Sequence, residues 1–389
     1  MLRLAALALC LASSLALPAG ADEAGYTTEL FNGKDTTGWV VTGTTVDVVD
    51  GALRTKENDG FVRSALPYDD FVLELDWKAS DQEKYDSGIY IRCDAPAPDS
   101  KRVWPAKYQI NLKNGDEGNL LGVKTGGKST GLIKKGDWNH FKVTVVGNSA
   151  EMEINGKPAW KAEGLDVPRG YIGLQSEVPL GGQFLFKNIK VTELGFTSLF
   201  NGKDLSQWTP KETGYAVHDG IIEFDPKLKK GGNLYSEKEY EDFALRFDFK
   251  LEPGTNNGLG IRTPTKGDAA YVGMELQILD DVHPKYKGIA PYQSHGSVYG
   301  IAPAKRGFLK PAGEWNTQEV IAKGRHITIT LNGTVIQDVD LDQAAPEGKT
   351  LDHKEHPGMN NSSGHIGFLG HGDPVAFRAI RIKNLKPTP

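Results

Sequence analysis

The clearest pattern along the chain is the alternation of apolar and polar residues in short segments bounded by Gly, Asn, Asp or Pro. Four such segments are 71–77, 141–146, 243–249 and 326–331. Successive side chains of a strand point to opposite faces, so this period of two predicts half-buried β-strands. The chain has 46 glycines and 21 prolines, which suit many tight turns better than helices. The pattern therefore predicts an all-β fold.

One predicted strand, 273–281, carries candidate chemistry and reads Gly-Met-Glu-Leu-Gln-Ile-Leu-Asp-Asp. Alternation places Glu275 and Gln277 on one face. The other face receives Met274, Leu276 and Ile278. In a sandwich of two sheets the apolar face meets the core, so the acid and the amide are expected to face outward on a concave sheet where a ligand can lie. An ordinary solvent-facing pair is the alternative.

The chain also contains an internal duplication. Leu-Phe-Asn-Gly-Lys-Asp occurs at 30–35 and again at 199–204, and Gly-x-Trp-Asn occurs at 136–139 and again at 313–316. Both copies close on a Gly-x-Ile-Gly strand, and the second copy holds an extra loop within 341–363. Short alternating strands with turn signals in each copy predict two tandem jelly-roll sandwiches.

The N-terminal residues 1–21 have the features of a secretory signal peptide: a short basic start, an apolar run and an Ala-x-Ala motif ending at Ala21. We expect cleavage near Ala21 and a secreted or periplasmic protein. The remaining chain is expected to form a first jelly-roll domain over 22–194 and a second over 195–389.

Composition excludes several classes of protein. Cys10 falls in the predicted signal peptide, which leaves Cys93 as the single cysteine and excludes an internal disulfide and zinc sites built on several thiolates. The formal net charge of −5 gives no basic footprint for nucleic acid. No second apolar run is long enough for a transmembrane helix. The sequence indicates no oligomeric state.

Several motifs occur together: Leu-Phe-Asn-Gly-Lys-Asp followed by Trp, Gly-x-x-Ile-Arg, Glu-Leu-Gln-Ile-Leu-Asp-Asp and a closing Gly-x-Ile-Gly followed by Phe-Arg-x-Ile. In this combination the chain resembles the 3-keto-disaccharide hydrolase family, over nearly its whole mature length and as two copies. The resemblance implies a concanavalin A-like jelly roll that acts on glycosides oxidised at C3 of the sugar. A ketone at C3 acidifies the C2 proton, so a base removes it, the enolate expels the C1 group, and water adds to the double bond.

The resemblance also implies roles for residues of the second copy. Glu275 is expected to be the base or a metal ligand, His371 a base, acid or ligand, and Tyr299 a proton donor or a stacking partner. Binding of the sugar or the enolate is assigned to Arg262, Gln277 and Asp280. The requirement for a divalent metal ion stays open. The extra loop holds His353 and His356, but their spacing is not diagnostic of metal binding, and a solvated loop is the simpler interpretation.

The first copy departs from this pattern, although Arg92 keeps the arginine of the motif. An alignment of Gln109 with Gln277 places Lys107 where the second copy has its strand carboxylate, and the closing strands place Glu177 where the second copy has its histidine. Loss of the strand carboxylate favours a first copy that binds sugar or supports the second. The alternative is a variant site around Arg92, Gln109 and Glu177.

Two other functions are compatible with the sequence. One is a non-catalytic lectin-like protein, in which aromatic residues such as Trp104 and Tyr271 stack on sugar rings. The other is a conventional glucanase-like glycosidase, and retaining enzymes of that kind need two carboxyl groups about 5 Å apart. Asp280 lacks the parity to share a face with Glu275 unless the strand contains a bulge. Turnover that depends on oxidised sugar and on Glu275 and His371 separates the three functions.

Overall fold

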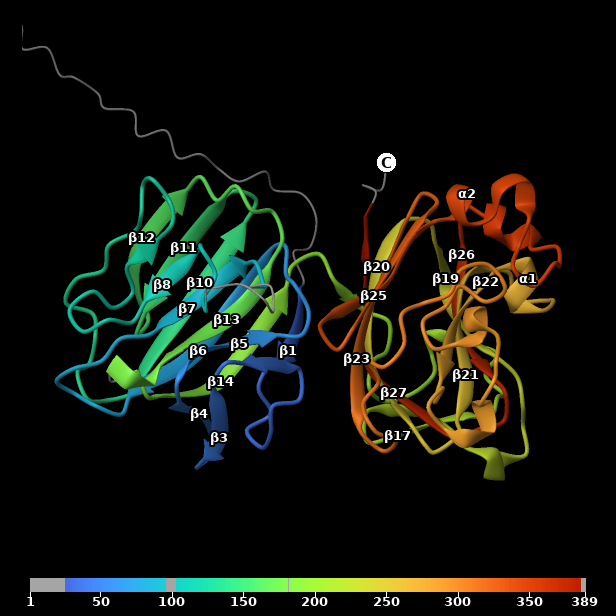
Figure 1. Cartoon of the computed structure of the whole chain (residues 1–389), viewed down its shortest axis with the longest axis horizontal. Coiled ribbons are helices and arrows are strands. Elements are labelled where there is room, and N and C mark those ends of the chain that lie inside the picture. The colour runs from blue at the N-terminus through green and yellow to red at the C-terminus, as the bar shows by residue number, and fades with distance from the viewer. Residues whose placement is uncertain (1–24, 96–102, 181, 386–389) are drawn as a thin grey trace, which may run out of the picture.

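The computed structural model describes residues 25–95, 103–180 and 182–385, so the predicted signal peptide, 1–21, lies outside the described residues. The described chain forms two β-sandwiches in succession, the first on the left of Figure 1 and the second on the right. The prediction of an all-β fold with two tandem jelly rolls is confirmed.

The first domain has a back sheet and a front sheet. The back sheet runs β12 (Lys157–Glu163), β11 (Ser149–Ile154), β10 (Asn139–Val146), β6 (Phe71–Ala79), β14 (Phe184–Glu193), β4 (Ala52–Glu57) and β3 (Thr45–Val49), with β1 (Tyr26–Glu29) paired to β14. The front sheet runs β2 (Trp39–Thr42), β5 (Asp59–Ser64), β13 (Tyr171–Glu177), β7 (Gly88–Cys93), β8 (Gln109–Asn111) and β9 (Leu120–Leu121). The 3-10 turn η1 (Val178–Leu180) follows β13.

The second domain repeats this plan. Its back sheet runs β17 (Tyr215–His218), β18 (Ile221–Phe224), β27 (Val375–Asn384), β20 (Phe243–Leu251), β23 (Trp315–Lys323), β24 (His326–Leu331) and β25 (Thr334–Asp340), with β15 (Thr197–Ser198) paired to β27. Its front sheet runs β16 (Trp208–Thr209), β19 (Leu234–Tyr240), β26 (Gly364–Gly370), β21 (Asn256–Thr263) and β22 (Met274–Leu279).

Short helices occur in the connections of the second domain. They are η2 (Pro226–Leu228), α1 (Ala269–Val272), η3 (Pro284–Tyr286), η4 (Pro291–Gln293), α2 (Leu341–Ala344), η5 (Pro346–Gly348) and η6 (Pro357–Asn360). The last three belong to the segment 341–363, which joins β25 to β26 and is the extra loop of the second copy. This segment packs as an ordered layer rather than a solvated loop.

Each core forms because alternating strands supply one apolar face. In β20, the side chains of Phe243, Leu245, Phe247 and Phe249 are fully buried between the two sheets of the second domain. Burial of such a side chain contributes roughly 1.5–3 kcal/mol. β6 supplies the corresponding residues to the core of the first domain.

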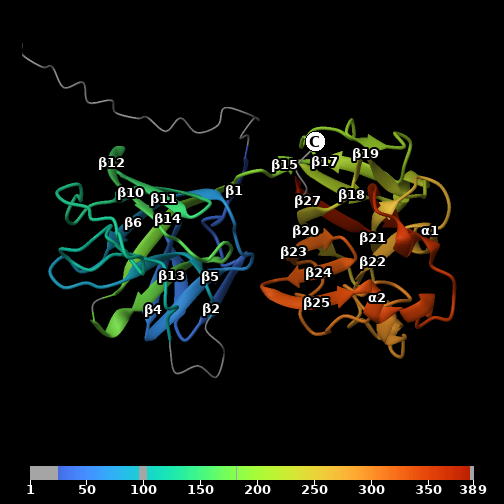
Figure 2. The same ribbon diagram turned by 90° about the horizontal axis from the view of Figure 1, so that it is seen from above.

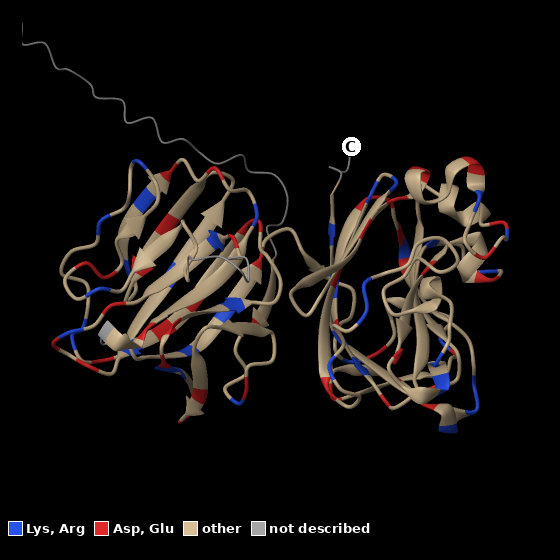
Figure 3. Cartoon of the chain, in the orientation of Figure 1, with Lys and Arg blue, Asp and Glu red and all other residues tan. Residues whose placement is uncertain are grey.

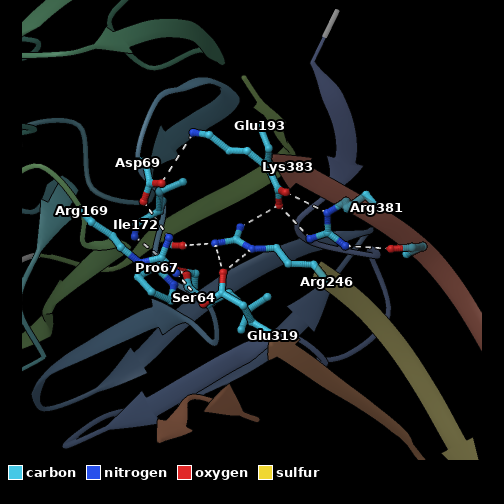
Figure 4. Close-up of polar contacts among 12 residues, drawn as sticks. Ser64, Pro67, Asp69, Arg169, Ile172, Glu193, Arg246, Glu319, Arg381 and Lys383 are labelled. Atoms are coloured by element: carbon cyan, nitrogen blue, oxygen red, sulfur yellow. Dashed lines mark hydrogen bonds and ion pairs between the residues drawn. The ribbon is translucent and has the colours of Figure 1, made fainter. Parts of the chain in front are cut away.

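The back sheet of the second domain faces the first domain, and its front sheet lies on the far side (Figures 1 and 2). Figure 4 shows the contact between the domains. Glu193, at the end of β14, accepts hydrogen bonds from Arg381 at 2.8 and 2.7 Å and forms an ion pair with Arg246 at 3.0 Å. Arg246 also pairs with Glu319 at 2.7 Å, and Glu319 forms a second ion pair with Arg169 of the first domain at 2.5 Å.

Four members of this interdomain cluster, two arginines and two glutamates, are at most 3% exposed: Arg246, Arg381, Glu193 and Glu319. Burial alone would raise the pKa of Glu193, but the charges of Arg246 and Arg381 outweigh it, and the pKa lies below its ordinary value. Because several of these pairs cross between the copies, the two domains are held in one arrangement. Elsewhere, Lys and Arg are interspersed with Asp and Glu along the ribbons of both domains (Figure 3).

Two further observations bear on the expectations from composition. Within residues 25–95, 103–180 and 182–385, the structure contains no helix that is long and apolar enough to cross a bilayer. Cys93 is a free, buried thiol on β7.

Candidate active site

The candidate site lies on the outer face of the second domain's front sheet. Glu275 and Gln277 of β22 point outward, while the alternate residues enter the core. Those core residues are Met274, Leu276 and Ile278. The predicted alternation of this strand is therefore confirmed. Glu275 and Gln277 are nevertheless buried, at 5% and 4% exposure, because α1 and the segment 280–304 fold over the sheet and enclose a cavity.

The cavity has a volume of about 200 Å³. Its polar lining residues are Asn256, Asp268, Glu275, Gln277, Gln293 and His371. Its aromatic lining residues are Tyr271, Tyr286 and Tyr299. A larger cavity of about 720 Å³ lies between α2, η5 and η6, but none of the predicted catalytic residues lines it. We therefore place the candidate site in the smaller cavity.

Glu275 and His371 meet in this cavity. His371 follows β26, which pairs with β21, and β21 pairs with β22. The distance from His371 Nε2 to Glu275 Oε1 is 3.4 Å, with the His371 side chain 45% exposed and that of Glu275 only 6% exposed. The hydrogen bond with Glu275 raises the pKa of His371, while burial acts in the opposite direction. The pair can thus hold and pass on a proton at the edge of the cavity.

Gln277 presents an unused acceptor. Its Nε2 donates to Asn256 Oδ1 at 2.7 Å, and its buried Oε1 has no partner in the described chain. Asn256 is fixed in turn because its backbone N–H donates to Asp373 Oδ2 at 3.0 Å. A buried amide oxygen without a partner costs free energy, so this atom is suited to accept a hydrogen bond from a ligand hydroxyl.

Tyr299 also lines the cavity. Its backbone N–H donates to the carbonyl of Glu275 at 2.9 Å, which ties it to β22. Its hydroxyl oxygen accepts a hydrogen bond from Gln293 Nε2 at 3.4 Å, so the hydroxyl proton is free to point into the cavity. Burial raises the pKa of Tyr299, which keeps the phenol protonated at neutral pH.

The structure does not bring Arg262 to this cavity, contrary to its predicted role in sugar binding. Its side chain is 3% exposed and donates to the carbonyls of Glu241 and Gly324 and to Asp242 Oδ1 at 2.9, 2.6 and 3.1 Å. The cause is local: Arg262 has φ of 49° at a register shift between β21 and β26, so strict alternation ends before it. It ties β21 to two neighbouring loops.

Arg92 has the same structural role in the first domain and is also absent from any shared polar site with Gln109 and Glu177. It is buried, with φ of 46°, and pairs with Asp70 Oδ1 at 2.7 Å. Arg92 therefore does not take part in the alternative variant site, and its role is to hold the packing of the first domain.

Asp280 also lies outside the cavity lining. It is buried and its Oδ2 accepts a hydrogen bond from the backbone N–H of Gly254 at 2.8 Å. The carboxylate fixes the turn that precedes β21, in agreement with its parity along the strand. It is positioned to support the loop rather than to bind sugar.

The strand register corrects the alignment of the first copy. Gly258 pairs with Gln277 and Gly260 with Glu275 in the second domain, whereas Gly88 pairs with Asn111 in the first. The position of Glu275 is therefore occupied by Gln109, and not by Lys107 as the sequence alignment placed it. Lys107 instead pairs with Asp166 at 2.5 Å.

The glycines of β7 and β21 support this register. A Cβ atom on Gly88 would collide with the Gln109 side chain, just as one on Gly258 would collide with Glu275. Glu177 occupies the position of His371, and a chain of amides joins it to Gln109: Gln109 Nε2 donates to Gln175 at 2.7 Å, and Gln175 Nε2 donates to Glu177 at 2.8 Å. Burial raises the pKa of Glu177.

The histidines of the extra segment do not gather as metal ligands. His353 is exposed, whereas His356 is buried and contacts Asp352 at 3.1 Å. In the part of the chain that the structure describes, no three His, Cys, Asp or Glu side chains cluster around one point. Glu275 and His371 supply two potential ligands, so the divalent metal ion stays a prediction.

Sequence reasoning did not assign Asn256, Asp268 or Gln293 to the site, and it considered Tyr271 only as a stacking residue. Asn256 could have been identified from the sequence, because it lies on β21 two residues before Gly258, on the same face as this partner of Gln277. The other three lie in connecting segments. Periodic sequence patterns do not predict how such segments pack against β22.

Comparison with known proteins identifies both domains. Residues 26–192 and 195–383 match the family model described as the 3-keto-alpha-glucoside-1,2-lyase-like domain. A 3-keto-disaccharide hydrolase from Bacteroides thetaiotaomicron is 28% identical over 230 residues, covering 49% of this chain and 79% of that protein.

Two solved structures from Parabacteroides distasonis, both described as candidate glycosyl hydrolases, are also similar. One is 30% identical, covers 49% of this chain and 99% of its own, and superposes with a TM-score of 0.44. The other is 26% identical, covers 49% and 94%, and has a TM-score of 0.41. With two matched segments that span nearly all described residues, the chain belongs to the family of 3-keto-alpha-glucoside-1,2-lyase-like domains.

Proposed function

We propose that the second domain cleaves the glycosidic bond of glycosides that carry a ketone at C3 of the sugar. Family membership supports the coarser statement that the protein is carbohydrate-active and hydrolase-like. The observation that carries the finer proposal is the Glu275–His371 pair in a cavity that also presents the unpartnered Gln277 Oε1.

In this proposal the Glu275 carboxylate removes the proton from C2, and the electron pair of that bond forms the enolate with the C3 oxygen. The phenol of Tyr299 donates a hydrogen bond to this oxygen as its charge grows. The enolate then expels the C1 oxygen and leaves a double bond between C1 and C2. Addition of water across that bond gives the product of net hydrolysis. Half-exposed His371 orients Glu275 and connects it to solvent.

The size and chemistry of the cavity fit one sugar ring. Its volume of about 200 Å³ is below the roughly 300–1,000 Å³ of sites for drug-sized ligands. Gln277 Oε1 accepts a hydrogen bond from a sugar hydroxyl, and Tyr271, Tyr286 and Tyr299 offer aromatic walls. A glucanase-like mechanism with Glu275 and Asp280 is not supported, because Asp280 lies outside the cavity lining. The second carboxylate of the lining, Asp268, caps α1 by accepting a hydrogen bond from the backbone N–H of Ala270 at 3.2 Å.

For the first domain we propose sugar binding or support without cleavage. Gln109 stands where the second domain has Glu275, and an amide cannot act as the general base. Purified first-domain variants of the full chain test this: Gln109→Ala and Glu177→Ala should leave turnover intact and change only affinity for glycans. Loss of turnover in either would assign chemistry to the first domain.

Export after cleavage near Ala21 remains part of the proposal, and N-terminal sequencing of the mature protein checks it.

The main experiment compares a 3-keto-disaccharide with its unoxidised parent, with and without a chelator. We expect cleavage of the oxidised substrate only, and a loss of about 100-fold or more in kcat for Glu275→Gln and His371→Ala. A matched control is the pair of exposed Glu239 and largely buried His365, 3.6 Å apart on the same sheet but outside the cavity. Glu239→Gln and His365→Ala should retain turnover. Sugar affinity without product from either substrate would instead indicate a lectin-like protein.

A further inference from the structure

The extra segment 341–363 holds two walls of the cavity. The backbone N–H groups of Leu351 and Asp352 both donate to the carbonyl of Gly300, at 2.8 and 3.2 Å, directly after Tyr299. On the other wall, Asn361 Nδ2 donates to the carbonyl of Val272 at 2.8 Å, directly after Tyr271. The segment thus fixes the positions of both tyrosines relative to β22.

Tyr271 receives closer support from the same segment. Its ring lies 4.8 Å from the ring of buried His356, measured between centroids. His356 is itself fixed on both sides, by Asp352 at 3.1 Å and by the carbonyl of Ala270 at 3.1 Å. A side chain at Gly300 would collide with His356. The Tyr271 ring therefore packs against a side chain that is itself fixed.

The hydroxyl of Tyr271 has an unusual partner for a cavity tyrosine. Lys354 Nζ donates to it at 2.7 Å and also lies 5.0 Å from the centre of its ring. Since the ammonium occupies a lone pair of the oxygen, the phenolic proton remains available to donate into the cavity. A cation at this distance also stabilises the phenolate that forms when the proton leaves.

The hydroxyl of Tyr299 has a different kind of hydrogen-bond donor from that of Tyr271. It accepts from a neutral amide, that of Gln293, at the longer distance of 3.4 Å. Burial raises the pKa of Tyr299 above its ordinary value, which favours the protonated phenol. The two tyrosines are suited to different tasks: Tyr299 to donate a hydrogen bond, and Tyr271 to give up a proton.

We propose that Tyr271 is the general acid that protonates the departing glycosidic oxygen, and that Lys354 holds its hydroxyl in place and balances the charge of the phenolate. The inference rests on the proposed function. When the C1–O bond breaks, its electron pair stays on the oxygen, which takes the proton of Tyr271. When water then adds at C1, its proton returns to the phenolate, and C2 recovers its proton from Glu275. Both groups are thereby restored.

The test compares two substrates with Tyr271→Phe in the full chain: a methyl 3-keto-glucoside, whose leaving alkoxide needs a proton, and a 4-nitrophenyl 3-keto-glucoside, whose leaving phenolate does not. We expect kcat/KM to fall by about 100-fold or more on the methyl glycoside and by less than about 5-fold on the nitrophenyl glycoside. Lys354→Met should shift the same ratio in the same direction. Because both substrates are measured on one preparation, partial unfolding of a variant cancels in the ratio.

Two controls define the outcome. Tyr299→Phe should lower both activities by a similar factor. Lys349→Met, which removes an exposed cation of the same segment paired with Glu347, should change neither. Equal losses on both substrates in Tyr271→Phe would overturn the inference and leave the proposed function standing. Absence of turnover by the wild-type protein on both substrates would overturn the two together.

Discussion

At the scale of single residues, His295 is the buried group with the clearest electrostatic consequence. The backbone N–H of Leu279 donates to its Nδ1 at 3.3 Å, so Nε2 carries the proton and donates to Gln318 Oε1 at 3.0 Å. The ring stacks on Phe249 with centroids 5.2 Å apart. Burial lowers the pKa of His295 to about 4. The surroundings of His295 therefore favour a neutral imidazole.

We expect this residue to make folding sensitive to acid. The unfolded imidazole binds a proton near pH 6.5 and the folded one only near pH 4, so the stability it contributes is complete above pH 6.5 and declines as the pH falls toward 4. At pH 5 the loss is about 2 kcal/mol. The free energy of unfolding, measured with denaturant, should fall between pH 7 and pH 5 in the wild type. In His295→Gln this fall should be smaller by about 2 kcal/mol.

The control for this measurement is His326→Gln, since His326 is about half exposed and pairs with Asp338 on the surface. Its loss of stability between the two pH values should follow that of the wild type. If His295→Gln also followed the wild type, the neutral buried imidazole would not be the cause of the acid sensitivity.

At the scale of elements, the glycines of β21 decide how closely β22 can present its side chains. Gly258 lies beneath the Glu275 carboxyl, and a Cβ atom there would collide with it. At Gly260, on the same face of the strand, the three nearest atoms to a Cβ atom would belong to the side chains of Leu369, at 3.1 Å, and Thr263, at 3.2 Å, and not to Glu275. One glycine thus makes room for the proposed base and the other does not.

Gly258→Ala is accordingly expected to displace Glu275 and to lower kcat/KM on a 3-keto-disaccharide by about 100-fold, the cost of roughly 1 Å of misplacement. Gly260→Ala should stay within about 5-fold of the wild type, because Leu369 can yield. Similar losses in both variants would mean that the strand, and not the carboxyl position, is responsible.

The same elements show how far sequence reasoning reaches. Alternation identified the faces of β22 correctly, because that strand is regular from Met274 to Leu279. The role that the resemblance implied for Arg262 was wrong, because a positive φ at a register shift turns its side chain away from the cavity. The alignment of Gln109 with Gln277 was also wrong, since a shared residue type is weaker information than the strand register. The walls of the cavity come from connecting segments, and tertiary packing decides how these segments lie against β22.

At the scale of the whole molecule, the interdomain cluster couples the folding of one domain to the folding of the other. Glu193 belongs to the first domain, and both arginines that neutralise it, Arg246 and Arg381, belong to the second. The alternation of β20 predicts that Arg246 faces away from the core, as it does. Its burial was not predictable, because the cover comes from a different domain.

Removal of this charge should destabilise the full chain. Glu193→Gln leaves two arginines buried beside an amide, and breaking such a pair costs about 3–5 kcal/mol. Equilibrium unfolding in denaturant measures the difference. Glu29→Gln, which removes an exposed partner of Lys190, is the control and should change stability by less than about 0.5 kcal/mol. A change of that small size in Glu193→Gln would show that the interface contributes little to folding.

The contact between the domains joins two different surfaces, the strand end of one copy and the back sheet of the next. Such a heterologous, head-to-tail contact has no built-in limit and would allow a linear array. The strand register shows where the limit arises. On the first back sheet, Glu74 stands at the position of Arg246, and at the end of β27 Asn384 stands at the position of Glu193. A carboxylate that approaches the first back sheet would meet Glu74 beside Lys190, which stands at the position of Arg381, and the second domain offers Asn384 in place of a carboxylate. The charge cluster that joins the two copies therefore cannot be repeated in the same form at either free surface.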